Sequence, residues 1–117
     1  MAADLPSPDL LDQAALVAIK MACSYRGYES FDKASIALRR SARRYQTSEQ
    51  VAALEMGVSL FEEAKTRLAA HLRRSGTSSP SQKTIQAIAR NLPSAYPGYS
   101  KSTYLSAANM AAFWLCK

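Results

Sequence analysis

The sequence predicts an all-α fold, a compact bundle of about five helices. Apolar residues recur at three- and four-residue spacing along most of the chain, and no stretch alternates apolar and polar residues for long enough to form a strand. A chain of 117 residues that is 48% hydrophobic and 21% charged is also typical of one folded domain with a modest core. We therefore expect a single helical domain over residues 1–117.

The first helix is expected to begin at Ser7, whose hydroxyl can cap it, and to end at about Gly27. Pro8 suits the first helical position because its missing N–H costs no hydrogen bond there. The apolar residues at helical spacing in this segment are Leu10, Leu11, Ala14, Val17, Ala18, Met21, Ala22 and Tyr25.

The second helix is expected from about Phe31 to Tyr45, and it carries the most distinctive run of the chain. This run, Arg39-Arg40-Ser41-Ala42-Arg43-Arg44, places four guanidinium groups within six residues. At about 100° per residue, the four arginines span an arc of about 140° on a helix. The opposite side carries the residues that are expected to pack, which are Phe31, Ala34, Leu38, Ala42 and Tyr45.

The third helix is expected from Thr47, which can form a capping box with Gln50, to about Gly76. On its outward face, Glu63 and Arg67 have the i, i+4 spacing of an ion pair. The apolar stripe that should face the core contains Val51, Leu54, Val58, Phe61, Leu68 and Leu72.

The last third of the chain predicts a linker and two more helices. Residues 76–82 (GTSSPSQ) are small and polar, which indicates an exposed linker. A fourth helix of about ten residues is expected next, followed by a loop over residues 93–99 that holds Tyr96 and Tyr99. The fifth helix, over residues 100–115, is apolar on nearly all sides, so it should be buried in the core or against a partner.

The formal net charge of +6 is unevenly distributed along the chain. Residues 1–63 carry seven basic and nine acidic side chains, whereas residues 64–117 carry eight basic side chains and no acidic one. A segment without carboxylates attracts polyanions. Nucleic acid is the commonest partner of this kind, and an acidic protein surface or an anionic membrane is the next.

The arginine run allows two interpretations. No carboxylate precedes any of the four arginines by four residues, whereas a solvated helix face usually mixes both signs of charge. The planar guanidinium group also matches the oxygens of a phosphate. A solvated or protein-facing patch stays open as the alternative, because the helical phase of Ile36 places it among the arginines. The basic residues that would extend a nucleic-acid path are Arg73, Arg74, Lys83, Arg90 and Lys101.

Residues 83–110 resemble a helix-turn-helix in outline, because the fifth helix opens with the polar and basic run over residues 100–103. The connection over residues 91–99 is longer than the usual three or four residues, so two ordinary packed helices are the competing interpretation. Tyr96 and Tyr99 are candidates for stacking on unpaired bases. Alternatively, their rings seal the edge of the core.

We expect no catalytic site, metal site or cofactor. His71 is the only histidine and has no other ligand at metal spacing. Glu62 and Glu63 are adjacent, so on a helix they point about 100° apart and cannot act as a catalytic pair. Cys23 and Cys116 are distant from each other, and neither a signal peptide nor an apolar membrane span is evident, so we expect a cytoplasmic protein with reduced thiols.

These observations favour a non-catalytic protein that contacts the phosphate backbone of RNA or DNA with little base specificity. In size, helicity and basic character the chain resembles the small helical subunits that line the nucleic-acid path of RNA-guided CRISPR complexes. This resemblance is one of architecture, and it implies a place in a larger nucleoprotein complex with other protein subunits as partners. Two alternatives stay open: a helix-turn-helix regulator that binds DNA, and an interaction module or inhibitor that docks on an acidic protein, with helix 100–115 as a contact.

Overall fold

The computed structural model describes the backbone of residues 7–24, 28–77 and 79–115, and the side chains of these residues except 21–24 and 28–32. Within these ranges the chain forms five α-helices and one short 3-10 helix, and it contains no strand. The prediction of an all-α bundle of about five helices is therefore confirmed. The helices are α1 (Pro8–Ser24), α2 (Tyr28–Ser41), α3 (Thr47–Ser75), α4 (Gln82–Asn91), the 3-10 helix η1 (Leu92–Ser94) and α5 (Lys101–Leu115).

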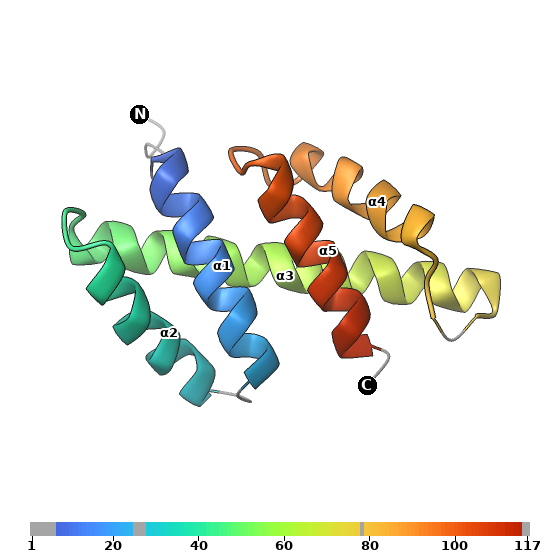
Figure 1. Cartoon of the computed structure of the whole chain (residues 1–117), viewed down its shortest axis with the longest axis horizontal. Coiled ribbons are helices and arrows are strands. Elements are labelled where there is room, and N and C mark those ends of the chain that lie inside the picture. The colour runs from blue at the N-terminus through green and yellow to red at the C-terminus, as the bar shows by residue number, and fades with distance from the viewer. Residues whose placement is uncertain (1–6, 25–27, 78, 116–117) are drawn as a thin grey trace.

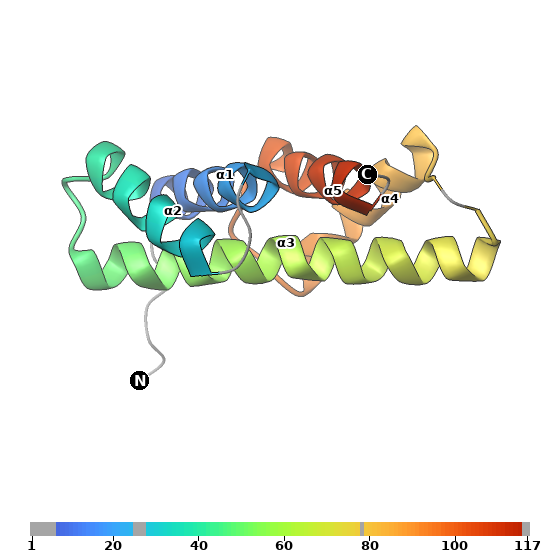
Figure 2. The same cartoon turned by 90° about the horizontal axis from the view of Figure 1, so that it is seen from below.

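The long helix α3 forms one layer of the molecule by itself. Its 29 residues span about 43 Å, close to the longest dimension of a molecule that measures 45 × 31 × 22 Å. The helices α1, α2 and α5 lie on one side of α3, and α4 slopes from that side down to the level of α3 (Figure 2). α1 and α2 cover its first half and α4 and α5 its second half, with α1 and α5 in contact in the middle (Figure 1).

The crossing of α1 over α3 is close because both helices carry small residues there. A Cβ atom on Gly57 of α3 would lie only 2.8 Å from the Cα atom of Ala15 in α1. The predicted apolar stripe is wrong at Val51 and Val58, which are each 37% exposed. That stripe counted only large apolar residues, whereas the buried face of α3 combines large apolar residues with the small residues Ala53, Gly57 and Ala64. Its buried residues are Gln50, Ala53, Leu54, Gly57, Leu60, Phe61, Ala64 and Leu68.

Helix α2 ends at Ser41, so the expectation that all four arginines share one helical face is wrong. Only Arg39 and Arg40 are helical, and Arg43 and Arg44 lie in the turn that leads to α3. In a longer helix the four arginines would form two like-charge pairs at i, i+4 spacing, which destabilises a helix. Ending the helix at Ser41 avoids that arrangement.

The turn between α2 and α3 is held by a buried side chain. Nε2 of Gln50, a residue that is 6% exposed, donates to the carbonyl oxygens of Ala42 and Tyr45, each at 2.9 Å. Ala42 is buried and Tyr45 packs against the core, as the sequence predicts for this face. Phe31 is expected on the same face, but its side chain lies outside the described residues. The backbone of the turn is thus fixed from inside the molecule.

The capping pair of α3 lies one residue earlier than expected. The backbone N–H of Gln46 donates to Oε1 of Glu49 at 3.3 Å, whereas the sequence suggests Thr47 and Gln50 for this role. Gln50 is not free to cap because its amide is engaged in the turn. The sequence alone does not distinguish two such pairs in adjacent registers.

Of the remaining helix ends, α2 begins at Tyr28, three residues before the expected Phe31, and the others agree with the predictions where the structure describes them. α1 ends at Ser24, and the expected end at Gly27 lies outside the described residues. Gly76 ends α3 with φ 70°, and its N–H donates to the carbonyl oxygen of Leu72 at 2.9 Å. Ser81 caps α4 by accepting from the N–H of Thr84. The described residues of the predicted linker are exposed, except for the half-buried Pro80.

Candidate nucleic-acid interface

All nine basic residues that the sequence singles out are exposed, but the structure divides them into three groups. One group lies at the corner between α2 and α3, a second at the far end of α3, and a third at a pocket between α4 and α5. The groups are Arg39, Arg40, Arg43 and Arg44; then Arg73, Arg74 and Lys83; and finally Arg90 and Lys101.

The arginine corner consists of Arg39, Arg40, Arg43 and Arg44. Nη2 of Arg44 donates to the hydroxyl of Tyr45 at 3.0 Å and lies 3.6 Å from a carboxylate oxygen of Asp9 in α1. This ion pair is weak because the two side chains are 68% and 77% exposed to solvent. The other three arginines of the corner form no ion pair with any residue that the structure describes.

The corner is anchored to the start of α1 as well as to α3. Oγ of Ser7 donates to the hydroxyl of Tyr45 at 3.0 Å, and the guanidinium carbon of Arg44 lies 4.9 Å from the centre of the Tyr45 ring. Together with the hydrogen bonds from Gln50, these contacts fix the backbone while the charged groups stay in water. Such a corner can present several guanidinium groups to one anionic ligand.

The second basic group lies at the opposite end of the molecule. Arg73 and Arg74 are in the last turn of α3, and Lys83 is in the first turn of α4. The whole length of α3, about 43 Å, separates this group from the arginine corner. The structure therefore does not join Arg73 and Arg74 to the corner as one short continuous path.

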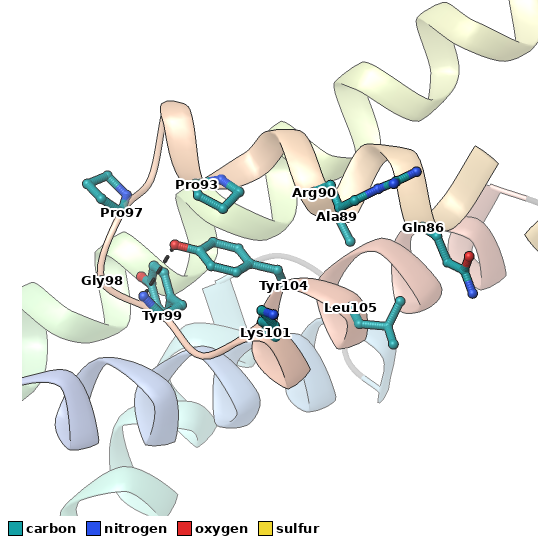
Figure 3. Close-up of a pocket in the computed structure, with 10 residues that line it drawn as sticks. All are labelled: Gln86, Ala89, Arg90, Pro93, Pro97, Gly98, Tyr99, Lys101, Tyr104 and Leu105. Atoms are coloured by element: carbon teal, nitrogen blue, oxygen red, sulfur yellow. Dashed lines mark hydrogen bonds between the residues drawn. The ribbon is translucent and has the colours of Figure 1, made fainter. Parts of the chain in front are cut away.

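The third basic group borders a pocket between α4, the 93–99 loop and the start of α5 (Figure 3). The pocket has a volume of about 720 Å³. This cavity could not be predicted from the sequence, because its walls come from α4, the 93–99 loop and α5, which the chain reversal after η1 brings together. Its lining residues are Gln86, Ala89, Arg90, Pro93, Pro97, Gly98, Tyr99, Lys101, Tyr104 and Leu105.

The two tyrosines proposed for base stacking occupy different places. Tyr99 lines the pocket but is only 8% exposed, and its ring meets that of Tyr104 edge to face at a centroid distance of 5.6 Å. Tyr96 is half-buried, and its carbonyl oxygen accepts a hydrogen bond from the hydroxyl of Tyr104. These positions favour the alternative in which the rings seal the edge of the core.

Helix α5 offers little surface for reading a DNA groove. Its buried residues face the other helices, and Lys101 is the one basic residue within its bounds. The connection from α4 includes η1 and extends to Ser100, which is longer than a helix-turn-helix turn. Two apolar residues of α5 are exposed, Leu105 at 36% and Phe113 at 59%.

Among the described residues, no three side chains of histidine, cysteine, aspartate or glutamate gather as a metal site. His71 lies beside Thr84, with 3.5 Å between Nε2 and Oγ1. None of the helices, over the residues described, has the length and hydropathy needed to cross a membrane. No model of a protein family, no curated protein and no solved structure matches this chain.

Proposed function

We propose that this protein binds the phosphate backbone of nucleic acid through the arginine corner. The observation that carries the proposal is a set of three exposed arginines that form no ion pair with a described residue, next to a fourth that has one weak ion pair. Uncompensated like charges repel one another, and a polyanion relieves that repulsion while releasing its own counterions. Phosphate contacts carry no sequence information, so we expect little preference among bases.

The proposal is restricted to one corner of the molecule. Four guanidinium groups at one turn match a short stretch of backbone, whereas the far end of α3 lies about 43 Å away. A footprint of this size gives modest affinity by itself. A place in a larger nucleoprotein complex, where other subunits add contacts, forms part of the proposal because linked sites bind more tightly together.

Two double variants with equal loss of charge test the proposal. Arg40→Gln/Arg43→Gln removes two charges from the corner, and Arg73→Gln/Arg74→Gln removes two charges from the far end of α3. Fluorescence anisotropy would measure binding of single-stranded RNA, single-stranded DNA and duplex DNA between ~50 and ~200 mM salt. If four arginines contact phosphates, the slope of log K against log salt is about −3 for a single strand, and the corner variant should halve it.

We expect the corner variant to bind at least about tenfold more weakly at ~50 mM salt, and the far-end variant to bind within about twofold of wild type. Equal losses in both variants would show that net charge, rather than the corner, attracts the ligand. The nucleic-acid proposal fails if wild type binds none of the three ligands at ~50 mM salt.

One observation favours a second candidate, an acidic protein partner. Ile36 is 51% exposed on α2, about one turn before the arginines, and an apolar side chain there has no role in phosphate binding. An interface that combines Ile36 with the arginines would resemble the apolar centre and charged rim of protein complexes. In the same assay, Ile36→Ser should leave nucleic-acid affinity unchanged, whereas it would weaken a protein complex.

A further inference from the structure

The pocket between α4 and α5 has an apolar interior. Figure 3 shows Pro93 and Arg90 on the α4 side, Leu105 and Lys101 on α5, and the ring of Tyr104 between the two helices. The volume of about 720 Å³ lies within the range of about 300–1,000 Å³ that is usual for small-molecule sites. Such sites are typically apolar with a few polar groups that orient the ligand.

The charged groups of the pocket are all positive. Arg90 and Lys101 come from different helices, both are exposed, and neither forms an ion pair with a described residue. No aspartate or glutamate lines the pocket, and the nearby Asp12 accepts a hydrogen bond from the N–H of Ser100 at 2.9 Å. Lys101 also begins α5, where the helix dipole adds partial positive charge.

We propose that this pocket binds a small aromatic carboxylate, independently of the proposed nucleic-acid binding. The ring would pack against Pro93, Tyr104 and Leu105, and the carboxylate would accept hydrogen bonds from Arg90, Lys101 or both. The cations lie beside apolar walls, so a ligand needs an apolar body and an anionic end to satisfy both parts. α4 has only ten residues, about 15 Å, which is too short a wall for a long partner helix.

A titration with naphthalene-2-carboxylate at neutral pH tests this proposal on the full chain. Two-dimensional ¹H–¹⁵N NMR spectra would locate the binding site without any prior assay of function. We expect saturable shifts in the amide signals of Gln86, Ala89, Tyr99 and Leu105, and none around the arginine corner. Naphthalene-2-carboxamide has the same ring without the charge, so it should bind at least about tenfold more weakly.

A pair of double variants then tests the roles of the two cations. Arg90→Gln/Lys101→Gln should weaken binding of naphthalene-2-carboxylate at least about tenfold. Arg74→Gln/Lys83→Gln also loses two positive charges, but these lie outside the pocket, so this variant should bind naphthalene-2-carboxylate as tightly as wild type. The spectrum of each variant without ligand reports whether it is folded.

Three results would overturn the proposal. The first is the absence of saturable shifts at millimolar carboxylate, and the second is equal affinity for the carboxylate and the carboxamide. The third is binding that folded Arg90→Gln/Lys101→Gln retains in full. None of these results bears on the arginine corner, because the anisotropy assay tests that site separately.

Discussion

At the scale of single residues, the hydroxyl groups of Tyr99 and Tyr104 differ in their hydrogen bonding, although the two rings are in contact. The hydroxyl of Tyr104 accepts from the N–H of Tyr99 at 3.3 Å and donates to the carbonyl oxygen of Tyr96. The hydroxyl of Tyr99 is buried without a hydrogen-bond partner among the described residues. Burial raises the pKa of Tyr99 to about 12, and the nearby Tyr104 and Asp12 add to the shift.

This pKa predicts a loss of stability in alkali. The folded protein keeps Tyr99 protonated at pH values where the unfolded chain, with a tyrosine pKa near 10, has lost the proton. The stabilisation is therefore complete below pH 10 and is lost as the pH rises through about 12. Tyr99→Phe removes the titrating group, so its urea midpoint should fall less than that of wild type between pH 8 and pH 11.5.

Tyr104→Phe is the matched control for this prediction. At pH 8, Tyr99→Phe should be as stable as wild type or more so, because the lost hydroxyl had no partner. Tyr104→Phe deprives a carbonyl oxygen and an N–H of their partner and should cost about 1–3 kcal/mol at the same pH. Equal stability of the two variants at pH 8 would contradict the assignment of these hydroxyls.

At the scale of the helices, the contact of α1 with α3 depends on Gly57. Alanine is favoured over glycine within a helix by about 1 kcal/mol, so Gly57→Ala would stabilise an isolated α3. In the folded protein, however, the new methyl group would meet backbone atoms of Ala15 at 2.8 Å. Because backbone cannot move aside as a flexible side chain does, α1 and α3 would have to separate.

We predict that Gly57→Ala lowers the free energy of unfolding by about 1–3 kcal/mol, the usual cost of overpacking. Ser59→Ala, at an exposed position two residues further along α3, should change it by less than about 0.5 kcal/mol. Urea denaturation followed by circular dichroism would measure both values. A Gly57→Ala protein as stable as wild type would show that this helix crossing adapts without cost.

The fold class and most helices could be predicted from the sequence because they depend on local periodicity and on residues such as Ser7 and Gly76, which end or cap a helix. The like-charge arginine pairs argue against a longer α2, but its end at Ser41 could not be predicted, since the turn that follows is held by Gln50, a polar residue of the next helix that becomes buried. For the same reason the geometry of the arginine corner could not be predicted, although the sequence shows its four arginines plainly. Gln50, a polar residue three places after the start of α3 and preceded by the Arg43-Arg44 turn, carries no distinctive signal in the sequence.

At the scale of the whole molecule, α3 connects two pairs of helices that carry different candidate sites. The arginine corner belongs to the α1–α2 half, and the pocket belongs to the α4–α5 half. The buried residues nevertheless form one cluster that extends from Leu10 in α1 to Ala112 in α5. One continuous core predicts that neither half unfolds without the other, as is usual for domains below about 150 residues.

The single tryptophan provides the means to test this cooperativity, because Trp114 lies far along the chain from the α1–α3 crossing. Its ring is 4.9 Å from Nζ of Lys65, which also lies 4.9 Å from the Phe61 ring and forms an ion pair with Glu62 at 2.9 Å. Trp114 fluorescence therefore reports the packing of α5 on α3. Circular dichroism reports all the helices together.

We predict that urea unfolding gives one midpoint by both probes, and that Gly57→Ala lowers both midpoints equally. The substitution lies at the α1 crossing, so a shift in the Trp114 signal can arise only if the two halves unfold together. If α1 and α2 instead detach first, circular dichroism of Gly57→Ala would become biphasic while the Trp114 midpoint stayed at the wild-type value. In that case ligands at the corner and in the pocket would each stabilise only their own half of the molecule.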